Sequence, residues 1–115
     1  MSEFFQSEVV RAELAEISEL QEEIYNNVFK FPTMSKEDQQ YHIEVLERLI
    51  EKQKVLYTRL SLSDDPEAKV MKESIIASAK QMGFPSNMDM NIMFSQMYKM
   101  VEMMKNSVDR DQFPL

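Results

Sequence analysis

The chain contains one glycine and four prolines in 115 residues. A β-sandwich of this length would need many tight reversals, and such reversals depend on glycine and proline. The composition therefore predicts an all-α protein. The same residues separate four helical segments. The boundaries lie at Pro32, at Pro66, at Gly83 with Pro85, and at Pro114.

Apolar residues recur at helical spacing in the first two segments. In residues 7–30 the stripe consists of Val10, Leu14, Ile17, Leu20, Ile24 and Val28. We expect this helix to stop near Phe29, because the residue before a proline is disfavoured in the α region. Ser35 with Asp38 resembles a capping box and opens the segment 36–60. Its seam alternates gaps of four and three, as in a coiled coil: His42, Leu46, Leu49, Gln53, Leu56 and Leu60.

The third and fourth segments have clear boundaries. Asp65 and Pro66 fit the N-cap and first position of a helix, and Gly83 fits its left-handed C-terminal residue. A similar cap at Ser86 opens the last helix. We expect residues 107–115 to form a flexible tail.

The predicted fold is a single helical domain, residues 1–115, with four antiparallel helices. Short connections favour antiparallel neighbours, so one long hairpin would pair 7–30 with 36–60. A shorter hairpin would pair 66–82 with 87–106. Because the shorter hairpin leaves part of the longer apolar stripe bare, we expect a homo-oligomer, with a dimer favoured. The alternative is a monomer in which the tail and Phe4–Phe5 fold over the gap.

Seven methionines lie within residues 87–106. Methionine fills irregular gaps in a core, and it also forms binding surfaces that adapt to different apolar partners. Both uses remain open, because these side chains cover more of the helix than one core face requires. The candidate oligomer or partner interface comprises Leu46, Leu49, Gln53, Leu56, Met97, Met100, Met103 and Met104.

The net charge is −7, which disfavours binding to nucleic acid and to anionic membranes. An acidic ridge follows the first helix: Glu13, Glu16, Glu19, Glu22 and Glu23. It is either a solvated face or a contact for a basic partner. Arg48, Lys52 and Arg59 could contact phosphate, which gives the alternative hypothesis of a transcription-associated or nucleic-acid-associated regulator. They could equally pair with neighbouring glutamates.

Residues with catalytic or cofactor-binding potential are scarce. The chain has no cysteine and one histidine, His42, which we interpret as a polar residue of the seam or helix start. No glycine-rich loop could hold a phosphate, and we expect no cofactor or metal and no enzymatic activity. No apolar run approaches the roughly 20 residues of a membrane span, and we expect no signal peptide, because the amino-terminal residues lack its basic and apolar regions. We therefore expect a cytoplasmic protein without membrane attachment.

Three stretches support a family resemblance: "FFQSEVV", "HIEVLERLIEKQKVLYTRLSLSDDPEA", and "MKESI" through "QMGFP" to the final Met- and Phe-containing segment. Together they resemble a family of small proteins of cyanobacteria and their phages, domain of unknown function family 1825. The resemblance implies a compact helical protein. It supplies no activity and no functional residue to transfer.

The sequence thus favours a non-enzymatic interaction or regulatory protein. It would act through its apolar Met-rich face or its acidic face. In a phage setting, the partner would be a host protein whose process the chain modulates.

Overall fold

A computed structural model describes residues 3–81, 83 and 89–109, except for the side chain of Ala79. These residues form helices and no strand, which confirms the all-α class. The elements are α1 (Glu3–Gln6), α2 (Glu8–Asn27), the 3₁₀ helix η1 (Val28–Thr33), α3 (Lys36–Leu62), α4 (Pro66–Gln81) and α5 (Met90–Asp109).

Side-chain caps fix the starts of the helices. The Ser35 hydroxyl accepts a hydrogen bond from the Asp38 amide at 3.2 Å, and Asp65 Oδ1 accepts one from the Glu67 amide at 2.9 Å. Both caps were predicted, and each satisfies an amide that has no partner within its helix. For α5 the cap is Asp89, whose Oδ1 accepts from the Asn91 amide at 2.7 Å. The predicted cap Ser86 lies outside the described residues.

Two predicted helix ends need correction. The first α-helix ends at Asn27, and residues 28–33 continue as a 3₁₀ helix that includes Pro32. The last helix continues to Asp109, so residues 107–109 are not part of a tail. Val108 is 1% exposed, and its burial extends the helix beyond the predicted end. Residues 110–115 lie outside the described residues. Gly83 has φ of 101°, which confirms its left-handed conformation.

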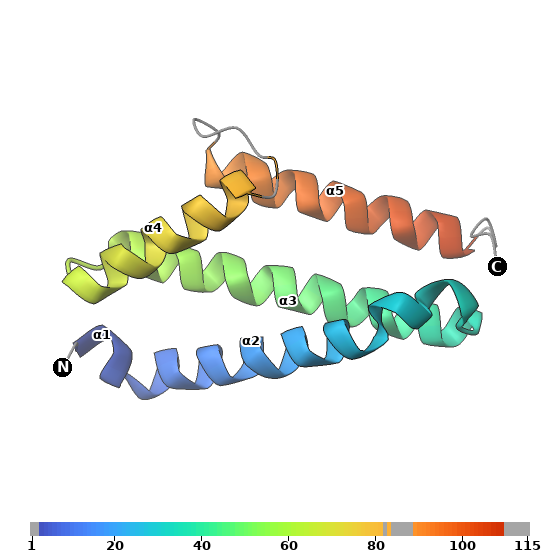
Figure 1. Cartoon of the computed structure of the whole chain (residues 1–115), viewed down its shortest axis with the longest axis horizontal. Coiled ribbons are helices and arrows are strands. Elements are labelled where there is room, and N and C mark those ends of the chain that lie inside the picture. Colours follow the sequence, from blue (N-terminus) through green and yellow to red (C-terminus); the bar gives the residue numbers. More distant parts are fainter. Residues whose placement is uncertain (1–2, 82, 84–88, 110–115) are drawn as a thin grey trace.

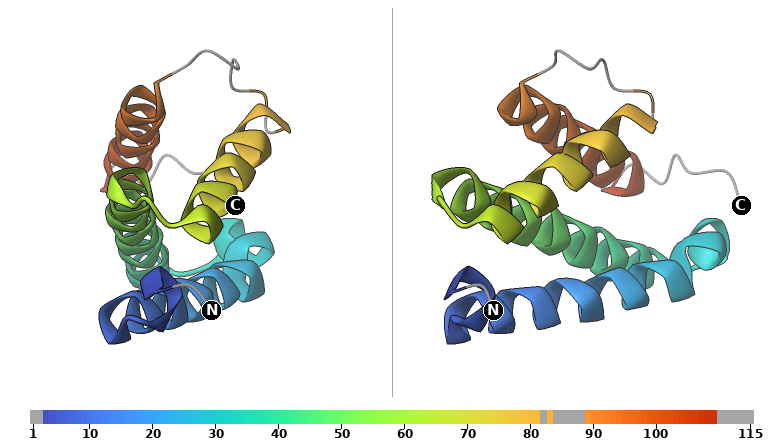
Figure 2. Two further views of the ribbon diagram at one scale, coloured as in Figure 1. Left: turned by 90° about the vertical axis from the view of Figure 1, so that its left-hand side faces the viewer. Right: turned by 60° about the vertical axis from the view of Figure 1, so that its left-hand side comes forward.

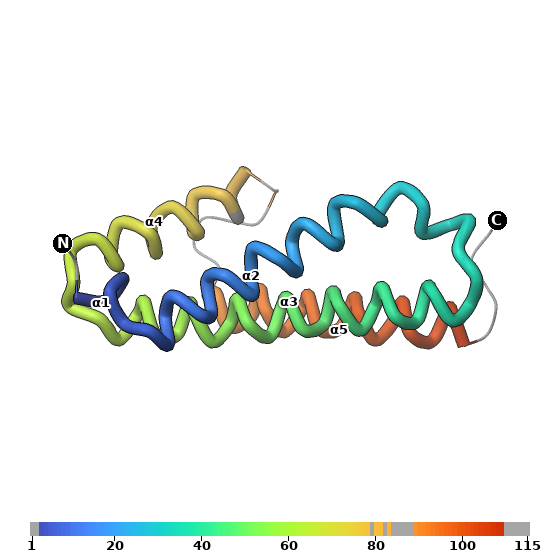
Figure 3. The backbone as a smooth tube through the Cα atoms, turned by 90° about the horizontal axis from the view of Figure 1, so that it is seen from below, coloured from blue at the N-terminus to red at the C-terminus, as the bar shows by residue number. Residues whose placement is uncertain are grey.

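The long helix α3 is the centre of the fold. It packs along both α2 and α5 and also contacts α4 (Figure 1). The α2–α3 hairpin is antiparallel, as predicted. A hairpin of α4 and α5 is not confirmed, because α4 crosses obliquely and then α5 runs in the same general direction (Figure 3). In the end-on view of Figure 2, α5 lies above α3 whereas α4 leans to one side.

The core consists of two clusters of buried residues that share α3. The first cluster joins α3 and η1 to α5, and its members are Phe31, Ile43, Ile50, Met90, Met93, Phe94, Val101 and Val108. The second joins α2, α3 and α4 through Ile17, Leu49, Leu56, Leu60 and Ala68. Phe4 and Phe5 pack against the second cluster. The amino-terminal residues therefore cover part of the apolar surface, as the monomer alternative required.

Candidate functional site

One of the concave surfaces of the described residues is a predominantly apolar groove. It has a volume of about 620 Å³, and residues of α2, α3, α4 and α5 line it. None of its fourteen described lining residues is charged, although 29% of the chain is Asp, Glu, Lys or Arg. Charged residues are depleted at the cores of protein interfaces. The lining of this groove therefore shares the depletion of charge that is typical of interface cores.

Each helix contributes one row of side chains to the groove. From α2 come Leu14, Ile17, Ser18, Gln21 and Tyr25, and from α3 come Gln53 and Leu56. The row on α4 consists of Met71, Ser74, Ile75 and Ser78, and the row on α5 of Met93, Phe94 and Met97. Spacings of three and four place each row on one helix face. The buried members form the floor, and the serines, Gln21 and Tyr25 are exposed at the rim.

An exposed, uncharged and largely apolar stripe on α5 adjoins the groove. We define the α5 stripe as Ile92, Gln96, Met100 and Met103. Ile92 is 52% exposed, Met100 60% and Met103 69%. Met100 lies three residues after the groove residue Met97, and side chains three apart are neighbours on a helix surface. The groove and the α5 stripe thus form one continuous uncharged surface.

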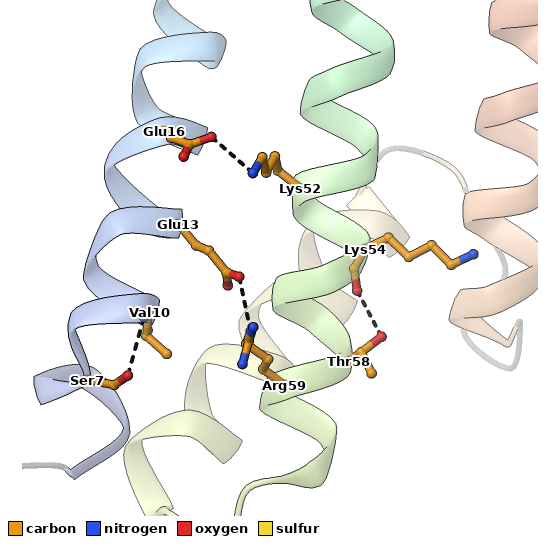
Figure 4. A network of polar contacts seen from close by, with 8 residues as sticks. All are labelled: Ser7, Val10, Glu13, Glu16, Lys52, Lys54, Thr58 and Arg59. Atoms are coloured by element: carbon orange, nitrogen blue, oxygen red, sulfur yellow. Dashed lines mark hydrogen bonds and ion pairs between the residues drawn. The ribbon is translucent and has the colours of Figure 1, made fainter.

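Ion pairs join α2 to α3 on a different face (Figure 4). Arg59 Nε donates to Glu13 Oε1 at 3.1 Å, and Lys52 Nζ lies 3.1 Å from Glu16 Oε2. The Glu13 side chain is only 13% exposed, and its second oxygen is buried without a hydrogen-bond partner among the described residues. These two pairs use part of both the acidic ridge and the basic stripe. Arg48 remains exposed on α3.

A smaller polar pocket of about 330 Å³ lies where the carboxyl-terminal half of α2 meets the start of α3. His42 lines it and is 6% exposed, with its ring 5.3 Å from that of Phe31. Burial lowers the pKa of His42, and the nearby Glu23 carboxylate partly opposes that effect. The Tyr41 hydroxyl donates to Glu23 at 2.9 Å, and this bond raises the pKa of Tyr41. His42 is thus a buried polar residue whose burial favours its neutral form.

The predicted interface residues occupy three environments. Leu49 and Leu56 are buried within the chain's own second cluster. Leu46, Met97 and Met104 are half-buried against the first cluster, and Gln53 is half-buried in the groove. Met100 and Met103 are exposed. The structure therefore unites Gln53, Leu56 and Met97 in the groove and leaves Met100 and Met103 available beside it.

The predicted acidic ridge is divided by its partners. Glu13 and Glu16 pair with α3, and Glu23 accepts from Tyr41. Glu19 and Glu22 are exposed on the outer face of α2. Only Glu19 and Glu22 of the acidic ridge are thus exposed to solvent with no such ion pair or hydrogen bond among the described residues.

Residues 2–108 match the family model described as domain of unknown function (DUF1825). The chain belongs to this family. No curated protein and no solved structure matches it. The family match covers every described helix up to Val108, so the groove and the α5 stripe lie within the family's own domain.

Two further findings concern the described part of the chain. None of its helices is both long and apolar enough to cross a membrane. Within the same residues, no group of three or more His, Cys, Asp and Glu is placed to hold a metal ion.

Sequence reasoning missed the rim of the groove. Ser18, Gln21, Tyr25, Ser74 and Ser78 are unremarkable when read one helix at a time. What these residues share is their position: each lies on an uncharged face of a helix whose other faces are charged. On α2, that face lies beside a ridge of glutamates, and the contrast was visible in the sequence.

Proposed function

We propose that the protein is a non-enzymatic interaction protein of the cytoplasm whose groove binds an apolar, uncharged helix face of a protein partner. The observation that carries this proposal is the absence of charge across a groove that remains open to solvent. A purely solvated surface of this acidic protein would have no reason to exclude charge from four helices at once. Desolvating a charged group costs far more than desolvating a serine or an amide.

The shape of the groove supports a helical partner. Its walls are rows of side chains with helical spacing, and its apolar floor suits residues repeating at i, i+3, i+4 and i+7. The rim supplies hydroxyl and amide groups that can hydrogen-bond to the polar edge of such a helix. Methionines at Met71, Met93 and Met97 allow the walls to adapt to the side chains that enter.

The nucleic-acid hypothesis receives no comparable support. Two of its three basic residues, Lys52 and Arg59, are in ion pairs with α2. Those pairs reduce the positive potential that a phosphate backbone would need. A protein with an apolar helix face, and not a nucleic acid, is the partner class that we propose.

A binding experiment with a defined probe tests the proposal. The probe is a synthetic amphipathic helix with leucine and methionine on one uncharged face. Methyl NMR of the labelled protein should show shifts at Met71 and Met97 on titration, and little change at Met34, which lies outside the groove. Ser74→Arg should abolish binding by placing a charge at the groove rim. Ala77→Arg, on the exposed outer side of α4, is the matched control.

Two outcomes would contradict the proposal. One is peptide binding that is equally strong in the Ser74→Arg and Ala77→Arg variants. The other is a groove that binds small apolar molecules, such as a fatty acid, but no helical peptide. In that second case the site would be a ligand pocket, and its volume would fit that class.

A further inference from the structure

We propose that the groove receives the α5 stripe of a second copy of this chain, so that two copies pair through a twofold interface centred near Met100. This inference rests on the proposed function, because it names the partner of the same groove. The chain itself carries the kind of helix face that the groove fits. The α5 stripe is exposed and uncharged, and three of its four residues are apolar.

The positions of the two surfaces fit a twofold pairing. In an isologous interface, the same patch of both subunits takes part and must complement itself. Here the α5 stripe and the α5 side of the groove are neighbours on one helix. Gln96 lies three residues after Met93, and Met100 lies three residues after Met97. When two copies face each other across an axis near Met100, the α5 stripe of each can enter the groove of the other. Such an arrangement would close at two subunits.

The groove and the α5 stripe together come close to the size of one side of a standard interface, with eighteen residues. Fourteen residues line the groove, and the α5 stripe adds four more. A standard protein interface uses roughly 20 to 30 residues on each side. Tyr25, at 77% exposed on the opposite rim, provides a large aromatic contact for the entering helix.

Charge gives the dimer a diagnostic salt dependence. Each copy has a net charge of −7, so two copies repel each other at long range. The proposed interface itself contains no ion pair. Salt should therefore strengthen the dimer by screening the repulsion, whereas binding through the acidic ridge to a basic surface would weaken as salt rises.

Cysteine crosslinking tests the geometry directly, because the chain contains no cysteine. One preparation carries Ser74→Cys in the groove rim, and a second carries Met103→Cys in the α5 stripe. A short bismaleimide should join the two chains in a mixture. A mixture of Val9→Cys and Met103→Cys is the matched control, since Val9 is 52% exposed on the distant first turn of α2. Equal yields from the two mixtures would overturn the inference.

Light scattering gives the second measurement. The wild type should have about twice the monomer mass of 13.6 kDa at micromolar concentrations. Met100→Glu should reduce it to a monomer with unchanged circular dichroism, and Val9→Glu should leave it dimeric. A dimer that resists Met100→Glu would overturn the inference. A wild-type monomer whose groove still binds the helical peptide would overturn it too, and would leave the proposed function standing.

Discussion

The two leucines at the end of α3 provide a sharp test of the fold. Leu60 is 1% exposed and belongs to the second core cluster, whereas Leu62, two residues later on the same helix, is 81% exposed. Replacing each with alanine removes the same atoms from the same helix. The structure predicts very different costs, because only the first substitution leaves a cavity.

The expected magnitude follows from burial. Leu60→Ala should lower the free energy of unfolding by about 2 to 5 kcal/mol, the range for fully buried leucines. At about 4 °C per kcal/mol for a chain of this length, the melting temperature should fall by about 8 to 20 °C. Leu62→Ala should change the unfolding free energy by less than about 0.5 kcal/mol, as is usual for exposed positions.

Urea denaturation followed by circular dichroism measures both values. It should be repeated at several protein concentrations, because an oligomer has a concentration-dependent stability. Similar losses for the two variants would show that the second cluster does not bury Leu60 in preference to Leu62. A larger loss for Leu62→Ala would mean that the phase of α3 against α4 is wrong.

Three further predictions concern single side chains. His42 has a lowered pKa in the folded state, so the unfolded chain binds a proton at this residue more readily than the folded chain does. The free energy of unfolding should therefore fall as the pH drops below about 6.5. In urea titrations across this range, His42→Gln should reduce the dependence of the unfolding free energy on pH, and an unchanged dependence would exclude His42 as its cause. Arg59→Ala should cost about 1 to 3 kcal/mol of unfolding free energy, because it leaves a nearly buried carboxylate without its partner. Lys52→Ala, whose partner is half exposed, should cost less than about 1 kcal/mol, and equal losses would contradict the difference in burial. Peroxide should oxidise exposed Met100 in the monomeric form well before buried Met93, and peptide mass spectrometry would reveal any reversed order.

Local signals in the sequence predicted the helices well. Ser35, Asp65 and Gly83 act through hydrogen bonds and dihedral angles within a few residues, so their roles follow from the sequence alone. The end of the last helix was placed too early, because the burial of Val108 in the first core cluster depends on tertiary contacts. No capping residue or other local signal in residues 107–109 predicts that the helix continues to Asp109.

The arrangement of α4 and the groove could not be predicted in the same way. A connection of several residues follows α4, and its length permits either an antiparallel return or an oblique crossing. The groove collects one row from each of four helices, so it exists only once their relative rotation is known. The methionines surround most of α5, and composition alone therefore gave no means of separating inward Met93 from outward Met100.

The central position of α3 has a consequence for the dynamics of the protein. Both core clusters include α3, and the other long helices each cover only a part of it. Its middle amides should therefore exchange with deuterium only when the whole chain unfolds, while the backbone of α4 can open in smaller fluctuations. The amides of α3 would then exchange slowly and those of α4 faster, and α4 borders the groove.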